Sequence, residues 1–198
     1  MAGLDRQKIV EVALDLVDAR GFEALTVRSL ATRLRVENPA LYWHFRDKQA
    51  LVNAMAAHLL APLGRPLRPG GWRDALARWA RLLRHAITAR RDGAAIVAAA
   101  DLTGSVFHEG QRALHAALVG DGLDASLARV AVITVCDFTL GAVLEERSEP
   151  GSARRRGARA MFEAGVQLLV DGIDARQRRA RDGRRGRTAS KLKPHHGQ

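Results

Sequence analysis

Residues 38–45, NPALYWHF, hold three of the nine aromatic residues in this 198-residue chain, including its single tyrosine. Leu41 and Phe45 stand four positions apart, so in a helix they share a face that can pack on a core. Residues 42–44, Tyr-Trp-His, fall on the other faces of the same short helix. Aromatic and polar side chains all round the axis are not typical of a core helix, and the stretch indicates a helix with a binding role.

The neighbouring residues predict a helix-turn-helix unit around this stretch. A helical apolar stripe covers residues 4–20. Thr26 can cap a second helix that ends near Leu34, and after a three-residue turn Asn38 can cap the short helix with Pro39 in its first turn. A packing helix followed by two helices around a short turn is the layout in which the last helix enters the DNA major groove.

In that layout the side chains around the short helix have contacts that suit them. A Tyr hydroxyl or a His N–H can donate to phosphate, and a small or flat side chain can touch a thymine methyl. Asn38 suits a bidentate contact with adenine, and Arg28 can reach a phosphate or a guanine edge. Lys48 begins a fourth helix, capped by Asp47, and can pair with a phosphate. The predicted DNA-binding residues are Thr26, Val27, Arg28, Asn38, Pro39, Ala40, Tyr42, Trp43, His44 and Lys48.

Tyr42 and Trp43 taken alone are more typical of packing residues than of an interface. The cap, the length of the turn and the flanking basic residues together favour DNA binding.

The rest of the chain also predicts helices, with no alternating strand pattern of useful length, so we expect an all-α fold. After a Pro/Gly-rich break at 61–71, the expected helices cover about 72–90, 94–100, 107–119, 124–147 and 154–177. The predicted units are a helix-turn-helix DNA-binding domain over 1–47, a ligand-binding and dimerisation domain over 48–177, and a basic tail over 178–198. The tail has almost no apolar residues, which predicts disorder.

The net charge of +11 indicates a polyanionic partner, but the charge is unevenly spread. Residues 1–47 hold seven basic and seven acidic residues, whereas residues 176–198 hold nine basic residues and one acidic residue. Net charge alone therefore does not locate a nucleic-acid site. It leaves open a second reading, a non-specific or architectural DNA-binding protein that acts through its basic tail without a ligand response.

Other classes of protein find little support in the sequence. We identify no apolar run as long as a membrane span and no signal peptide, so we expect a cytoplasmic protein without a membrane partner. The single cysteine, Cys136, excludes an internal disulfide and suits a small buried apolar position. No nucleophile elbow, P-loop or dinucleotide-binding loop is present, so we predict neither an enzyme nor a bound cofactor.

Residues 4–60 resemble the DNA-binding domain of the TetR family of bacterial repressors. The resemblance rests on GFE at 21–23, LTVR at 25–28, LYWH at 41–44 and Lys48, and it continues beyond that domain. Further along, RDGA at 91–94 and FTLG at 138–141 are similar to the C-terminal domain of the tetracycline repressor-like subgroup, so the resemblance covers about 4–175.

The resemblance implies an all-helical homodimer on a palindromic operator. The helices over 124–147 and 154–177 would form its four-helix interface, and two recognition helices would read half-sites about one helical turn apart. The apolar stripes of these two helices are equally compatible with an ordinary intramolecular core. They consist of Val130, Val132, Ile133 and Phe138, and of Val166, Leu169, Val170 and Ile173.

Two departures from the family pattern lie in the DNA-binding unit. Arg35 stands where the family usually has glycine, and a left-handed conformation there costs an arginine roughly 1 kcal/mol more than a glycine. Arg35 can also add a phosphate contact. Asn38 and Ala40 replace a glutamine and a threonine at base-reading positions, so the operator should differ from that of the tetracycline repressors.

The resemblance further implies a small-molecule pocket in the second domain. The positions that hold the drug and its magnesium in the subgroup become Gly64, Trp79, Leu83 and Val97, with only Glu145 kept. We therefore expect no tetracycline induction and no required metal. An apolar ligand suits what remains, although Trp79 and Leu83 at helical spacing are also typical of plain core, which leaves open a regulator without a ligand. The predicted effector residues are Trp79, Leu83, Val97, Ala100, Asp101, Phe138 and Glu145.

Overall fold

The structure, a computed structural model, describes residues 4–64, 70–103, 105–147 and 152–191, with side chains in the last stretch from 157 to 182. The described part consists of helices and connecting segments, as predicted, and contains no strand. Its elements are α1 (Arg6–Arg20), η1 (Phe22–Ala24), α2 (Val27–Leu34), α3 (Asn38–Tyr42), α4 (Lys48–Leu60), η2 (Ala61–Gly64), α5 (Trp72–Thr88), α6 (Gly93–Ala99), α7 (Val106–Gly120), α8 (Ala125–Arg147) and α9 (Ser152–Lys191).

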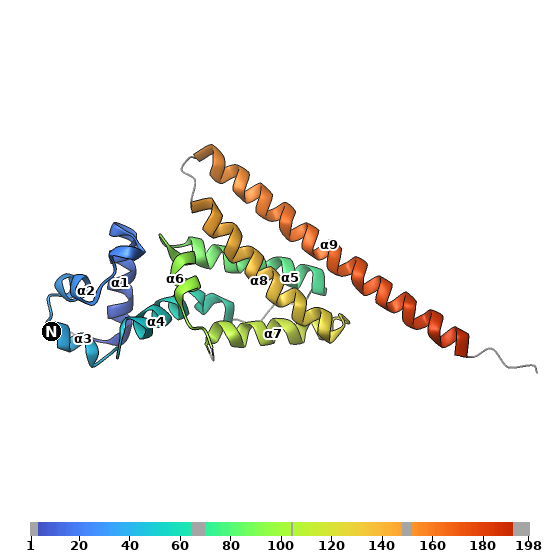
Figure 1. Cartoon of the computed structure of the whole chain (residues 1–198), viewed down its shortest axis with the longest axis horizontal. Coiled ribbons are helices and arrows are strands. Elements are labelled where there is room, and N and C mark those ends of the chain that lie inside the picture. The colour runs from blue at the N-terminus through green and yellow to red at the C-terminus, as the bar shows by residue number, and fades with distance from the viewer. Residues whose placement is uncertain (1–3, 65–69, 104, 148–151, 192–198) are drawn as a thin grey trace, which may run out of the picture.

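Helices α1, α2 and α3 form the N-terminal unit at one end of the molecule (Figure 1). Thr26 caps α2 as predicted: its side chain accepts the Ser29 N–H, and the Ser29 hydroxyl oxygen in turn accepts the Thr26 N–H at 2.9 Å. Leu41 and Phe45 are both buried in the core, so α3 docks through the face that their spacing predicts.

The start of α3 differs from the expectation by one residue. Glu37 occupies the cap position, because its carbonyl accepts the Ala40 N–H at 3.0 Å. Asn38 is therefore the first helical residue, and the prediction that Asn38 caps the helix is wrong. As predicted, Asp47 caps α4, and its carboxylate accepts the Ala50 N–H at 2.7 Å.

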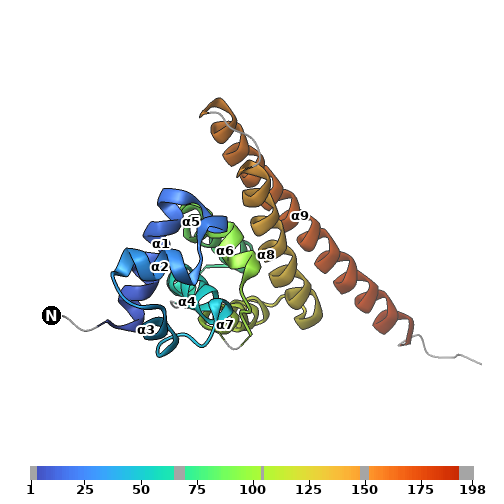
Figure 2. The same ribbon diagram turned by 60° about the vertical axis from the view of Figure 1, so that its left-hand side comes forward.

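The second unit surrounds one apolar core formed mainly by α5, α7 and α8. Leu76, Trp79, Leu83 and Leu114 are almost completely buried in it. Helix α9 lies beside α8 along the outside of the unit, and both views show that its far end points away from α1–α3 (Figures 1 and 2). The two C-terminal helices thus form an outer layer of the subunit.

Helix α8 is more apolar than the sequence analysis allowed. Residues Ala125–Glu146, whose most apolar 18-residue window has a mean hydropathy of 1.9, are long and apolar enough to span a membrane by length and composition alone. The expectation that no segment reaches this length is wrong, because Arg129 and Asp137 interrupt the run without lowering its average enough. The helix packs against α5, α7 and α9, which supplies protein neighbours for much of its apolar surface.

Helix α9 also runs further than expected. Disorder was predicted from residue 178, but the helix continues through Lys191. Once its first turns are packed on α8, each further residue extends the helix by one hydrogen bond, and arginine and alanine are good helix formers. The prediction is therefore wrong for residues 178–191, and residues 192–198 lie outside the described part.

Candidate nucleic-acid interface and effector region

Helix α3 and the residue that caps its C-terminal end present two aromatic side chains to solvent. Tyr42 is 53% exposed and Trp43 is 88% exposed, whereas Leu41 and Phe45 on the opposite face are each 5% exposed. An indole that remains this exposed contributes little to the core, so packing alone does not account for it. The arrangement is that of a docked helix whose outer face is available to a partner.

Arg6 at the start of α1 holds the end of α3 in place. Its Nη1 donates a hydrogen bond to the His44 carbonyl at 2.7 Å, and its guanidinium carbon lies 4.2 Å from the centroid of the Phe45 ring. No local sequence pattern marks Arg6 for this role, because its contact joins residues 38 positions apart.

The turn between α2 and α3 uses a left-handed arginine. Arg35 has φ 58° and ψ 44°, the conformation expected where the family has glycine. Its N–H donates to the Thr32 carbonyl at 3.3 Å, and the Val36 N–H donates to the Ala31 carbonyl at 3.1 Å. These two bonds satisfy the last carbonyls of α2 in the way a Schellman closure does, and they offset the roughly 1 kcal/mol cost of the left-handed residue.

Several predicted DNA-binding residues meet at the junction of α2, α3 and α4. Val27, Tyr42, Asp47 and Lys48 line one small hollow there. The Lys48 ammonium lies 5.7 Å from the centroid of the Phe22 ring and remains exposed at the start of α4. Val27 from α2 and Lys48 from α4 thus lie beside the exposed ring of Tyr42 in α3.

The other predicted DNA-binding residues occupy the outer surface of the same unit. Asn38, Pro39 and Arg28 are exposed, and Ala40 and His44 are half-buried. Thr26 is exposed, but its hydroxyl is committed to the cap of α2.

A basic groove lies between α1 and α2. Arg20, Arg28, Arg33 and Arg35 line it together with hydroxyl side chains, and its volume is about 550 Å³. Arg28 and Arg35 were proposed from the sequence as possible phosphate contacts, but Arg20 and Arg33 were missed. Arg20 lies at the end of α1 and Arg33 on the outer face of α2. Their helical spacing within a helix-turn-helix unit could have indicated that they lie side by side.

The predicted effector residues divide into a buried group and an exposed group. Trp79 is 1% exposed, and Leu83 and Val97 are also buried. The Trp79 ring stacks on Phe107 with centroids 6.3 Å apart, and a Cβ added at Gly110 would lie only 2.7 Å from the indole. Trp79 Nε1 is buried and makes no full hydrogen bond among the described residues, where the Cys136 thiol offers it only a weak interaction.

The exposed group lies apart from this core. Asp101 and Glu145 are exposed and Ala100 is half-buried. The Asp101 carboxylate accepts the Thr103 N–H at 3.0 Å, and its hydrogen bonds from Thr103 lower the pKa of Asp101. The structure therefore does not gather the predicted effector residues into one buried site.

Phe138 of α8 packs against α9. Its ring stacks on Phe162 of α9 with centroids 5.7 Å apart, and it lies so close to Gly165 that a side chain there would overlap it. A role in holding α9 on α8 accounts for this ring without a ligand.

Cys136 is buried close to Gln111, a residue that the sequence analysis did not single out. The Gln111 amide Nε2 lies 3.5 Å from the Cys136 sulfur. Burial raises the pKa of the Cys136 thiol, and the interactions with the side chains of Gln111 and Trp79 only partly oppose this effect. The prediction of a buried apolar cysteine is confirmed.

A polar seam joins the N-terminal unit to the segment between α5 and α6. The Asp92 carboxylate accepts the Phe22 N–H at 2.6 Å, and the Arg91 N–H donates to the Asp18 carboxylate at 2.8 Å. Arg90 forms ion pairs with both Asp15 and Asp18. The start of α6 is therefore fixed to the end of α1, a link between the two units that the sequence did not predict.

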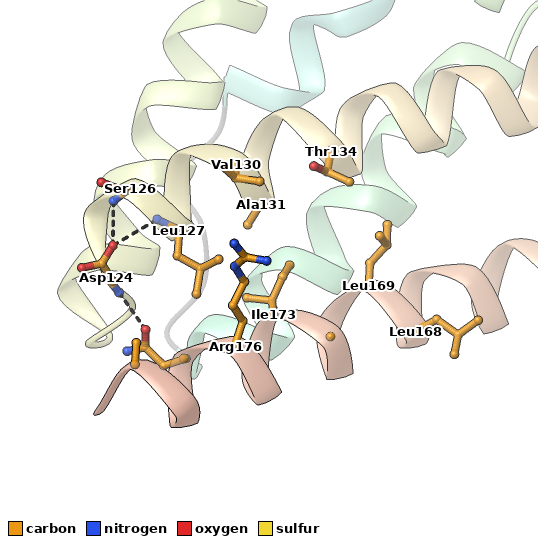
Figure 3. A pocket seen from close by; sticks show the side chains of 13 residues that line it. Asp124, Ser126, Leu127, Val130, Ala131, Thr134, Leu168, Leu169, Ile173 and Arg176 are labelled. Carbon is orange, nitrogen blue, oxygen red and sulfur yellow. Dashed lines mark hydrogen bonds between the residues drawn. The ribbon is translucent and has the colours of Figure 1, made fainter. Parts of the chain in front are cut away.

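The outer faces of α8 and α9 keep several large apolar side chains exposed. Val130, Ile133, Met161 and Leu168 are each at least half exposed. Figure 3 shows the groove between the two helices, with Val130 and Thr134 of α8 facing Leu169 and Ile173 of α9. The predicted stripes thus divide, because Val132, Val166 and Val170 point into the subunit core instead.

Comparison with known proteins shows that both units of this chain match domains of one protein family. The family model described as "Bacterial regulatory proteins, tetR family" matches residues 9–55, and the one described as "Tetracyclin repressor-like, C-terminal domain" matches residues 65–160. The class A tetracycline repressor protein from transposon 1721 of Escherichia coli is 36% identical over 203 residues, which cover 89% of this chain and 94% of the relative.

Solved structures of two relatives share the fold. One is BioQ with its natural double-stranded DNA operator, at a TM-score of 0.71 and 34% identity, covering 87% of this chain and 99% of that chain. The other is class A TetR in complex with 5a,6-anhydrotetracycline and magnesium, at a TM-score of 0.71 and 37% identity, with the same coverage. With both of its domains matched, this chain belongs to the tetR family of bacterial regulatory proteins.

Proposed function

We propose that this transcriptional regulator is a repressor that binds a palindromic operator as a homodimer and is released by a small, largely apolar ligand. The observation that carries the proposal is the exposure of Tyr42 and Trp43 on a helix that Leu41 and Phe45 dock firmly on the core. A helix held in this way can enter the major groove without reorganising the domain beneath it.

Two kinds of contact divide among the residues around α3. Tyr42, His44 and Lys48 supply donors for phosphate, which position the unit on the duplex. Asn38 and Arg28 reach for base edges, and Pro39 and Ala40 offer apolar surface for thymine methyls. The exposure of Asn38 at the first position of α3 supports its role as a base reader.

The dimer would form through α8 and α9. Exposed Val130, Ile133 and Leu168 lie on these helices, and a self-complementary pairing of the two faces would remove them from water. Two copies of α3 related by a two-fold axis would then read two symmetric half-sites. The BioQ structure, which contains an operator duplex, supports this mode of binding.

The effector should not be the magnesium–tetracycline chelate that class A TetR holds. In place of oxygen and nitrogen ligands, this chain has the buried side chains of Trp79, Leu83 and Val97. These side chains offer no metal ligand, and the exposed Glu145 cannot replace the missing set. A largely apolar molecule with one hydrogen-bond acceptor for Trp79 Nε1 fits this region better.

The seam at Asp92 offers a route from effector to DNA. A ligand that displaced α6 would strain the bonds from Asp92 to Phe22 and from Arg91 to Asp18, and so would shift α1 and the units packed on it. A ligand can only favour the released state by binding it more tightly than the DNA-bound state. We place the protein in the cytoplasm and assign it no catalytic activity.

Site selection from random duplexes tests the proposal directly. The full chain should enrich one palindrome, and Asn38→Ala should relax the preference at one symmetric pair of positions while leaving the rest of the palindrome intact. Enrichment of no sequence at all would overturn the proposal, and uniform weakening at all positions would show that Asn38 is not a base reader.

Release from the selected palindrome tests the effector assignment. Tetracycline with excess magnesium should leave the complex intact in a fluorescence anisotropy assay, whereas a class A tetracycline repressor on its own operator serves as the positive control. Release of this protein at a comparable drug concentration would contradict the assignment of an apolar effector.

A further inference from the structure

Helix α9 continues well beyond the body of the subunit. Gln177 is buried, and its Nε2 donates to the Gly122 carbonyl at 2.8 Å, as does Arg181 Nη2 at the same distance. The helix then runs ten residues further, to Lys191. At 1.5 Å per residue this adds about 15 Å of helix past its last described contact with the loop before α8.

This projecting segment is strongly basic. From residue 176 to residue 191 the sequence has eight basic residues and a single acidic one, Asp182. Two of these basic side chains have described partners: Arg178 pairs with Asp174 at 2.6 Å, and Arg181 bonds to Gly122. Arg176 and Arg179 are exposed. The helix also carries Arg184, Arg185, Arg187 and Lys191.

Helix stabilisation alone does not explain this composition. Basic residues in the last turn of a helix interact favourably with its dipole, but the effect fades within about one turn. The sequence places arginines at 181, 184 and 185, and like charges at spacings of three and four residues disfavour a helix. A polyanion along the segment would remove this repulsion.

The position of the segment separates it from the helix-turn-helix unit. Both views show the end of α9 at the opposite end of the subunit from α1–α3 (Figures 1 and 2). A duplex bound at α3 would therefore have to bend along the whole subunit to reach the end of α9 in the same subunit.

We propose that the α9 extension, residues 178–191, is a second DNA-binding surface that holds the phosphates of a duplex other than the one read by α3. Its affinity is independent of sequence, because it offers charge to the backbone and no groove-reading element. In the proposed dimer two such extensions let one protein bind an operator and a distant stretch of DNA together.

Duplex DNA fits the segment better than a membrane does. A helix that lies in a membrane surface needs a face of large apolar side chains, and between 178 and 191 the sequence supplies only alanine as an apolar residue. Arginine donates in a fork that matches phosphate oxygens. The helix-turn-helix unit already brings this protein to DNA, where duplex phosphate is the most abundant polyanion.

The test uses the full chain with Arg184, Arg185, Arg187 and Lys191 all changed to Gln, which keeps good helix formers and leaves Arg178 and Arg181 in place. Binding to a mixed-sequence 40-bp duplex is measured by anisotropy across a salt series. The variant should bind at least ten times more weakly at low salt. Its slope of log K against log salt should flatten by about 2 to 4, since each lost phosphate contact contributes about 0.9.

Two further variants separate the surfaces. Tyr42→Ala, which removes an uncharged phosphate donor from α3, should weaken mixed-sequence binding less than the four-residue variant does and should leave the salt slope unchanged. Arg112→Gln, which removes one exposed charge from α7, should leave the slope unchanged. If the four-residue variant binds the mixed-sequence duplex as tightly as the parent, the extension is not a DNA-binding surface and the proposal fails. Loss of binding to single-stranded RNA or anionic vesicles, with duplex binding unchanged, also overturns it.

Bridging is measured with the selected palindrome on beads and a labelled mixed-sequence duplex in solution. The parent protein should retain the labelled duplex and the four-residue variant should not, although both occupy the beads. This outcome does not depend on the effector. Selection of a palindrome without bridging defeats this inference and leaves the repressor proposal intact. If no palindrome is selected but the four-residue variant loses mixed-sequence binding, the repressor proposal fails and the second surface stands.

Discussion

Tyr42 packs partly against its own domain and keeps the rest of its ring exposed for a contact with DNA. About half of its surface remains exposed, and the rest of the ring borders the hollow that Val27 and Lys48 also line. Replacing it by alanine should weaken binding to the selected palindrome more than tenfold, because a phosphate donor and the surface that flanks the groove are both lost. Anisotropy measures the affinity, and sedimentation should show an unchanged dimer.

Tyr42→Phe resolves the two contributions, since it keeps the ring and removes only the hydroxyl. An intermediate loss is expected if the hydroxyl donates to phosphate. Leu82→Ala, on the exposed side of α5, is the matched control for removal of a surface side chain. Unchanged affinity in Tyr42→Ala would refute the docking of α3 in the groove.

Cys136 is the residue whose environment most clearly fixes its chemistry. The thiolate is the reactive form, and burial that raises the pKa of the thiol keeps it protonated at neutral pH. The native protein should therefore react with a thiol reagent such as DTNB many times more slowly than the protein unfolded in guanidinium. Rapid reaction of the native chain would mean that the core around Gln111 opens readily.

At the scale of single residues, the sequence predicted features that depend on neighbouring residues in the chain, such as which face of a short helix is buried. The four-residue separation of Leu41 and Phe45 predicted their burial. The left-handed Arg35 was expected from the resemblance to the TetR family, which usually has glycine at this position of the turn. Arg6 and Gln111 were not predicted, because their contacts depend on tertiary packing that brings distant segments together.

At the scale of elements, the segment between α5 and α6 determines how the two units are joined. Asp92 is left-handed and mostly buried, and its carboxylate accepts the Phe22 N–H. Asp92→Ala removes the acceptor and should destabilise the fold by about 1 to 3 kcal/mol, because a half-buried N–H loses its partner and alanine is disfavoured in the left-handed conformation. Calorimetry should show a lower Tm by several degrees.

Asp92→Asn is the matched control for that change. Asparagine tolerates the left-handed conformation, and its side-chain oxygen can still accept the Phe22 N–H. It should therefore lose less stability than the alanine variant. Hydrogen exchange at the Phe22 amide should rise in Asp92→Ala and change little in Asp92→Asn; equal exchange in both variants would contradict a stabilising role for this bond.

The bounds of helices were predicted well where the sequence has a clear capping residue and an apolar stripe, and poorly where it has neither. Thr26, Asp47 and Asp124 begin helices as expected, and Asp124 accepts the Leu127 N–H at 3.2 Å. The length of α9 was predicted wrongly. The helix was expected to end at residue 177, where the apolar pattern ends, but no proline stands there to stop it. The length of that helix is set by propagation from its packed part rather than by local signals.

At the scale of the whole molecule, the exposed outer layer of α8 and α9 is the surface through which we propose that two copies assemble. Sequence periodicity identified these helices as apolar, but it could not assign each residue to the subunit core or to a partner. The structure separates them: Val132, Val166 and Val170 are buried, whereas Val130, Ile133 and Leu168 remain exposed. The exposed set is the surface that a second copy would cover.

Leu168→Glu should convert the protein to a folded monomer. The side chain is 73% exposed, so a carboxylate there costs the isolated subunit little, but in a dimer it would be buried without a partner. Leu82→Glu, at a partly exposed leucine on α5, is the matched control and should remain dimeric. Light scattering after size exclusion reports the mass, and circular dichroism should show the same helix content in both variants.

The same pair of variants tests the link between assembly and operator reading. A monomer presents a single α3 and loses the symmetric second half-site, so Leu168→Glu should bind the selected palindrome at least tenfold more weakly and lose its advantage over a single half-site. Its binding to mixed-sequence DNA should fall less, because the α9 extension acts within each subunit. A dimeric Leu168→Glu would mean that another face of the molecule forms the interface.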